Sequence, residues 1–111
     1  MKLQPTLIAL ALASAIPSAQ AFDEAAAKAY AKNNDCFKCH APDKTKKGPS
    51  YVKMVEKYKG KTDAYQKMYK HMTTSSKVKL EDGTEEEHKP LDPAKEGDKI
   101  KNLIEWILSH K

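Results

Sequence analysis

Apolar residues recur at helical spacing in four parts of the chain. Residues 23–33 are alanine-rich, with acidic residues at the start and lysines later, which favours a helix and suits its dipole. Spacings of three and four residues predict two short amphipathic helices at 51–58 and 65–72. A stronger apolar stripe predicts a last helix at about 98–109. The pattern therefore predicts an all-α domain of four helices.

The stretch 73–97, ahead of the last helix, loses the helical period and contains glycines and prolines. We predict a long loop here, and loops of this length usually have a function. Val78 and Leu80 alternate with polar residues before Asp82-Gly83, a dipeptide typical of two-residue hairpin turns. The loop can therefore hold a short β-hairpin.

The beginning of the chain has the features of a secretory signal peptide. An apolar run at 7–16 follows a lysine, and Ala19 and Ala21 form a small-residue cleavage site. The run is about half of the roughly 20 residues that span a bilayer, so we expect no membrane span. We therefore predict a cleaved signal peptide at 1–21 and one domain at 22–111, exported to an oxidising space such as a bacterial periplasm.

Charge restricts the class of partner. All 20 basic residues are lysine, 15 residues are acidic, and the net charge is +5. The lysines are spread among acids, and no arginine is present to make bidentate contacts to phosphates or bases. We therefore expect acidic protein surfaces as partners and no nucleic acid. The charge, together with the lack of a long exposed apolar segment, favours a monomer.

Both cysteines lie in Cys36-Phe37-Lys38-Cys39-His40. This stretch fits C-x-x-C-H, the pattern of c-type haem attachment. Two thiols at this spacing can bond the two vinyl groups at one porphyrin edge, and the histidine that follows can bind the iron. The motif therefore predicts one covalently attached haem.

Three other interpretations of the cysteine pair are weaker. A disulfide would close a loop too short to add much stability, and it would leave His40 unexplained. A thioredoxin-like redox pair needs a strand before the motif and a helix starting at its first cysteine, whereas here a helix precedes it. A zinc site would need a second ligand pair, and the other histidines lack the usual spacing of such a pair.

With this motif, the sequence resembles the small class I c-type cytochromes of bacteria over essentially all of 22–111. Besides C-x-x-C-H, the resemblance rests on Lys47-Gly48-Pro49-Ser50-Tyr51 ahead of a helix that ends in Lys57-Tyr58, and on the closing segment 103–108 (LIEWIL). The first motif is highly specific and the Gly-Pro-x-Tyr stretch moderately so.

The resemblance implies the small cytochrome c fold, with about four helices around one haem c that is bound through Cys36 and Cys39. It implies that the first and last helices cross, with Trp106 near their contact. It also implies that the carbonyl of Pro49 accepts the free N–H of His40, an iron ligand, and so fixes its imidazole. We expect the chain to be largely unfolded without haem, because the haem adds apolar surface to a small core.

The sixth iron ligand departs from the family pattern. In the family, a methionine usually followed by proline reaches the iron from the loop before the last helix, but 73–97 contains no methionine. His88 lies 18 residues before Trp106 and two before Pro90, close to where that methionine would fall. We therefore predict bis-histidine ligation by His40 and His88.

Alternatives for the sixth position remain open: a vacant or water-bound site, or ligation by His71, Met72 or a lysine. The predicted hairpin also poses a difficulty. With a two-residue turn, His88 would lie opposite Lys77, on the face away from Val78, and a register shift of one residue would reverse this.

The resemblance and the ligand pair together imply a periplasmic single-electron carrier. Replacing methionine by histidine should lower its potential. The alternative is a haem sensor or ligand-binding protein with a labile sixth position; no catalytic constellation indicates an enzyme. We expect redox partner proteins with acidic docking faces, steered by lysines near the exposed haem edge, namely Lys38, Lys44, Lys46 and Lys47.

Overall fold

A computed structural model describes residues 22–111, so the predicted signal peptide at 1–21 lies outside the described residues. Helices dominate the fold, and a small hairpin precedes the last of them. In chain order the elements are α1 (Glu24–Asn33), the 3-10 turn η1 (Cys36–Lys38), α2 (Tyr51–Tyr58), α3 (Ala64–Thr73), β1 (Lys77–Lys79), β2 (Glu85–Glu87) and α4 (Pro93–Leu108). The predicted fold class, four helices with a hairpin before the last one, is confirmed.

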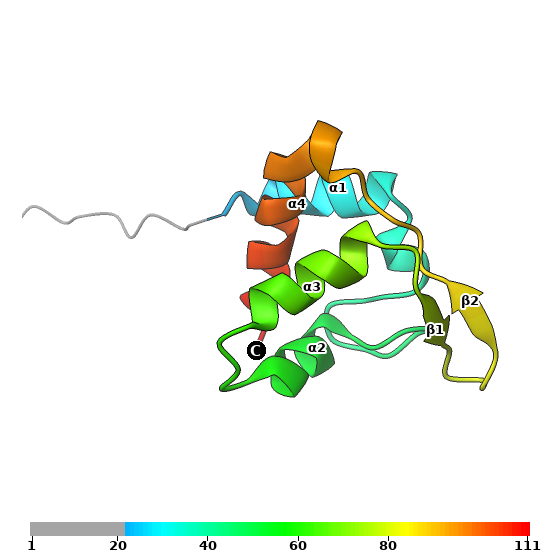
Figure 1. Cartoon of the computed structure of the whole chain (residues 1–111). Helices are drawn as coiled ribbons and strands as arrows, with labels where there is room; N and C mark the ends of the chain where they lie inside the picture. The colour runs from blue at the N-terminus through cyan, green and yellow to red at the C-terminus, as the bar shows by residue number, and fades with distance from the viewer. Residues whose placement is uncertain (1–21) are drawn as a thin grey trace, which may run out of the picture.

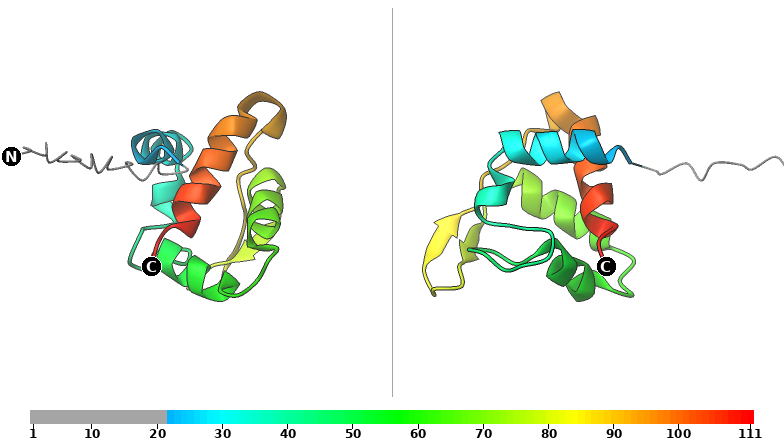
Figure 2. Two further views of the ribbon diagram at one scale, coloured as in Figure 1. Left: turned by 90° about the vertical axis from the view of Figure 1, so that its left-hand side faces the viewer. Right: turned by 180° about the vertical axis from the view of Figure 1, so that it is seen from behind.

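Helices α1 and α4 cross, as Figures 1 and 2 show. Near the start of α1, the backbone N–H of Asp23 donates to Oδ1 of Asn102 (2.7 Å), and Nδ2 of Asn102 donates back to the carbonyl of Asp23 (2.9 Å). Near the other end, the hydroxyl of Tyr30 donates to the carboxylate of Glu96. These contacts hold the two helices against each other where they cross.

The core lies where α4 meets the other helices. The apolar stripe of α4 supplies Ile100, Leu103, Ile104 and Ile107, each at most 1% exposed. Small side chains on α1 let the two helices approach closely, and α2 and α3 pack against α4 from the other side. Several half-buried apolar residues border this core: Phe22, Phe37, Met54, Tyr58, Tyr65, Tyr69, Met72 and Leu108.

Helix α4 begins earlier than its apolar stripe predicts. It starts at Pro93 rather than near residue 98, so the interpretation of 73–97 as loop throughout was wrong for its last five residues. The side chain of Asp92 caps the helix by accepting from the N–H of Ala94 (3.0 Å), and proline suits the first helical position. Glu96 has a non-helical backbone, so a short first segment meets the main helix at a kink.

The hairpin turn contains three residues rather than two. Lys77 pairs with Glu87 and Lys79 with Glu85, and the N–H of Leu80 donates to the carbonyl of Thr84 (2.8 Å). Gly83, in the left-handed region (φ 84°), closes this turn, as glycine does in three-residue hairpin loops.

The register therefore differs by one residue from that of a two-residue turn. His88 lies opposite Ser76, and its backbone N–H donates to the Ser76 carbonyl (2.8 Å). Its side chain shares the half-buried face of Val78, because residues two apart on a strand point to the same side.

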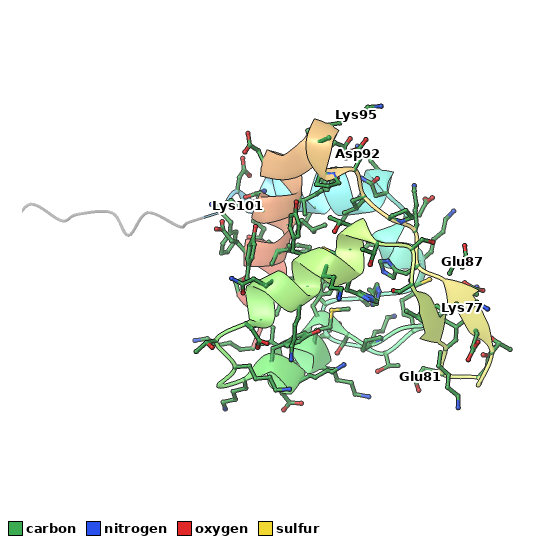
Figure 3. The ribbon with its side chains drawn as sticks, viewed as in Figure 1. Lys77, Glu81, Glu87, Asp92, Lys95 and Lys101 are labelled. Atoms are coloured by element: carbon green, nitrogen blue, oxygen red, sulfur yellow. The ribbon has the colours of Figure 1, made fainter. Side chains whose placement is uncertain are left out.

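The hairpin projects from the edge of the helical body (Figure 1). Its charged residues, including Lys77, Glu81 and Glu87, lie well apart from Lys95 and Lys101 on α4 (Figure 3). Within residues 22–111, no helix has both the length and the apolarity that crossing a bilayer requires.

Candidate functional site

The cysteine motif lies at the point where α1 ends and the chain turns. Nδ2 of Asn34 donates to the carbonyl of Tyr30 (2.9 Å), and Asp35 adopts a left-handed conformation (φ 61°) that ends the helical path. The 3-10 turn η1 follows, and the N–H of His40 donates to the carbonyl of Cys36 (2.9 Å). Both cysteines and the histidine therefore lie on one tight turn directly after α1.

Cys36 and Cys39 are half-buried free thiols. Burial raises the pKa of the Cys36 thiol, which disfavours the thiolate that zinc binding needs. No cluster of three or more histidine, cysteine or acidic residues that could hold a metal ion occurs within 22–111. The helix that precedes the motif also differs from the strand that a thioredoxin-like pair needs. The position of the motif directly after a helix therefore suits c-type haem attachment better than a thioredoxin-like pair.

His40 is oriented by its backbone neighbour. Its Nδ1 lies 2.7 Å from the carbonyl oxygen of Pro49. A carbonyl oxygen only accepts, so Nδ1 carries the proton and the Nε2 lone pair is left for a metal. Burial lowers the His40 pKa, an effect that the Pro49 hydrogen bond partly offsets, and the neutral imidazole is the form that can bind iron.

The segment 40–51, which we call the proximal loop, is tied back onto the motif. The N–H of Gly48 donates to the carbonyl of Cys39 (2.8 Å), and that of Tyr51 to the carbonyl of Ala41 (3.0 Å). A Cβ at Gly48 would lie 2.7 Å from Cε1 of His40. Glycine is therefore required here because the backbone passes directly against the imidazole.

Aromatic rings support the back of the motif. Trp106, 2% exposed, packs edge-on against Phe37 (6.4 Å between ring centres) and Tyr51 (5.4 Å). Tyr51 in turn stacks with His40 at 6.1 Å. Lys28 lowers the pKa of Glu24 on α1, and the indole of Trp106 adds to this effect. Trp106 thus lies between the crossing helices and the motif.

His88 faces the motif from the other side of the structure. Its ring centre lies 6.5 Å from that of His40. Two metal–imidazole bonds of about 2.0 Å, with a ring radius of about 1.1 Å at each end, separate two ring centres by about 6.2 Å. The spacing of these two histidines thus fits one iron between them.

The segment 71–91, which we call the distal wall, carries the other candidate ligands. The ring of His71 lies 4.3 Å from that of His88, and the N–H of Leu91 donates to the carbonyl of Met72 (2.7 Å). Burial lowers the pKa of His88, the nearby histidines His71 and His40 lower it further, and an interaction with the backbone of Lys89 offsets part of the shift. The wall therefore brings the imidazoles of His71 and His88 together.

One functional candidate, Ser76, was not predicted from the sequence. The side-chain polar atoms Oγ of Ser76 and Nδ1 of His88 are buried without a hydrogen-bond partner, and so is the hydroxyl of Tyr51. The alternation of Ser76, Val78 and Leu80 would have indicated that Ser76 points inward. Its position opposite His88 depended on the register, which the sequence left open.

Comparison with known proteins identifies what this arrangement resembles. Residues 24–111 match the family model described as cytochrome c. The structure is similar to the crystal structure of the class 1 cytochrome MtoD from Sideroxydans lithotrophicus ES-1, with 53% sequence identity and a TM-score of 0.76. The similarity covers 80% of this chain and 97% of that one. No curated protein matches the sequence.

Proposed function

The chain belongs to the cytochrome c family, and from this premise we propose that it is a periplasmic carrier whose haem iron is held by His40 and His88. Membership of the family implies an electron carrier rather than an enzyme, with haem c bound covalently through Cys36 and Cys39. The periplasmic location rests on the predicted signal peptide at 1–21. The ligand pair rests on the 6.5 Å spacing of the two rings.

The haem supplies an iron that gains and loses one electron. The protein keeps the accompanying rearrangement of the ligands small. His40 is held in one tautomer by Pro49, and the aromatic group around Trp106 packs behind the motif. Two imidazoles that hold the iron in both oxidation states would change little when one electron moves. Histidine in place of the usual methionine also favours a lower potential than that of methionine-ligated relatives.

The ligand assignment can be tested by the spin state of the oxidised holoprotein. We expect the electron paramagnetic resonance spectrum to show a low-spin bis-histidine signal, and His88→Ala to turn it high-spin. The matched variants His71→Ala and Met72→Ala should stay low-spin. If Met72→Ala or His71→Ala changed the spin state instead, and His88→Ala did not, the ligand would be that residue of the distal wall.

A binding assay separates a carrier from a sensor. Carbon monoxide added to the ferrous protein should leave the spectrum of a tightly ligated carrier almost unchanged. An immediate shift would mean a labile or vacant sixth position and would favour the ligand-binding alternative. The same assay on His88→Ala gives the positive control, since its iron should accept carbon monoxide at once.

Docking is proposed to use exposed lysines of the motif and proximal loop. Lys38 is partly neutralised by Asp35 (3.4 Å), and Nζ of Lys46 donates to the carbonyl of Phe37, so Lys44 and Lys47 are the stronger candidates for steering. Replacing both by alanine should slow electron transfer to an acidic partner at low salt. It should also weaken the salt dependence of the rate.

The control is Lys95→Ala, an equal change of charge per residue on α4, away from the hairpin (Figure 3). It should leave the rate at low salt nearly unchanged. A rate that did not depend on salt in the unmodified protein would contradict electrostatic docking altogether.

A further inference from the structure

A buried polar pair lies at the base of the hairpin. Oγ of Ser76 and Nδ1 of His88 are both buried, and neither has a hydrogen-bond partner in the described structure. Buried polar atoms in native proteins are nearly always paired, so each unpaired one needs an explanation. Here two of them belong to residues that lie directly opposite each other.

The backbone brings the two side chains within reach. The N–H of His88 donates to the carbonyl of Ser76 at 2.8 Å, which continues the register of β1 and β2 by one pair. Residues opposite each other on antiparallel strands have Cβ atoms about 4.5–5.5 Å apart and point to the same face. Rotation of the serine about χ1 can then bring its hydroxyl to the imidazole nitrogen.

The chemistry of the two groups is complementary. A neutral imidazole, the form that binds iron, carries one N–H and one lone pair. A serine hydroxyl can accept that N–H. If it does so at Nδ1, the lone pair is at Nε2, the same arrangement that the Pro49 carbonyl imposes on His40.

We propose that the Ser76 hydroxyl accepts a hydrogen bond from Nδ1 of His88 and thereby fixes the tautomer and orientation of this imidazole toward the iron. The inference rests on the proposed function, in which His88 is the second axial ligand. Ser76 is then a positioning residue, because it acts on the iron only through His88. On the distal wall, Ser76 then fixes the tautomer of His88, as Pro49 fixes that of His40 on the proximal loop.

The test uses the oxidised and reduced holoprotein with three substitutions. Ser76→Ala removes the hydroxyl, and Ser76→Thr retains one. Ser75→Ala is the matched control, because Ser75 is exposed and its hydroxyl contacts Glu87 (3.5 Å). The readouts are the low-spin signal of the ferric form and the affinity for exogenous cyanide, which has to displace His88.

Loss of a hydrogen bond behind a metal-binding histidine typically weakens the ligand 10–100-fold. We therefore expect Ser76→Ala to bind cyanide about 10-fold more tightly or better, with a shifted low-spin signal. Ser76→Thr and Ser75→Ala should resemble the unmodified protein in both readouts.

The result that overturns this proposal alone is a Ser76→Ala protein that matches Ser75→Ala in both readouts while His88→Ala turns high-spin. In that case His88 is the ligand and Ser76 does not position it. If His88→Ala stays low-spin, His88 is not the ligand, and the proposed ligand pair and the role of Ser76 are both overturned.

Discussion

The proximal loop and the distal wall face each other across the site, but the chain determines their geometry to different degrees. The proximal loop is tied to the motif by backbone hydrogen bonds, and its imidazole is oriented by Pro49. The distal wall carries two buried polar atoms without partners, on Ser76 and His88. The imidazole of His40 is thus oriented by a hydrogen bond, whereas Nδ1 of His88 has no partner among the described residues.

The largest expected effect comes from crowding the proximal loop. Gly48→Ala would place a Cβ 2.7 Å from Cε1 of His40 and 3.0 Å from its Nδ1. Either the ring or the loop must move, which we expect to destabilise the holoprotein by about 1–3 kcal/mol and to lower haem retention. Urea unfolding and the haem-to-protein ratio measure both effects.

Gly97→Ala is the control for this prediction. A Cβ at Gly97 would meet nothing within 4 Å, and the residue lies within α4. Alanine there should stabilise the protein by about 0.4–1 kcal/mol. If the two alanine variants had equal stability, the proximal loop would be more adjustable than its contacts indicate.

A smaller effect is expected from straining the distal wall. Gly83 closes the hairpin turn at φ 84°, and alanine in this left-handed conformation costs about 1–2 kcal/mol. Gly60→Ala adds the same kind of strain (φ 76°) in the loop after α2. Both variants should lose similar stability in urea unfolding.

Only Gly83→Ala should change the low-spin electron paramagnetic resonance signal, because the turn sets the register of His88. An equal spectral change in Gly60→Ala would mean that the signal reports general loosening rather than the distal wall.

The smallest effect concerns Tyr51 at the end of the proximal loop. Its hydroxyl is buried without a hydrogen-bond partner, unlike the backbone groups of that loop described above. Tyr51→Phe removes a buried polar group without a partner, so we expect no loss of stability at pH 7 and a small gain. Tyr30→Phe, which loses a hydrogen bond to the carboxylate of Glu96, should instead cost about 1.5 kcal/mol or more. Thermal unfolding of both variants tests this contrast.

At alkaline pH the stability of the unmodified protein should differ from that of the Tyr51→Phe variant. Burial raises the pKa of Tyr51 above its ordinary value of 10.0. The unfolded chain therefore releases this proton first, and the contribution to stability is present below pH 10 and lost above it. The unmodified protein should lose up to about 1.4 kcal/mol per pH unit more than Tyr51→Phe in that range. Parallel slopes would contradict burial of the phenol.

The sequence predicted the helices well because their stabilising residues recur at fixed spacing. It missed the first turn of α4, since Pro93 and the kinked Glu96 interrupt the apolar pattern that was used to locate the helix. The cap residue Asp92 followed by proline carried the missing signal.

The cysteine motif was likewise predictable, because its chemistry depends on neighbours in the chain. The distal wall was not, because its geometry depends on one residue of register in the hairpin. Asp82-Gly83 predicted a turn, but the turn length decided whether His88 would face Ser76 or Lys77. Pairing across space, rather than local propensity, fixes that choice.

The reciprocal hydrogen bonds between Asp23 and Asn102 bring the two ends of the domain to one side of the molecule (Figures 1 and 2). A domain whose ends lie on the same side can be circularly permuted, since a linker can join them. New ends would suit the exposed turn at 59–63, between α2 and α3. Such a permutant would place α3 and the distal wall at the start of the chain and the cysteine motif near its end, so His88 would be synthesised before His40.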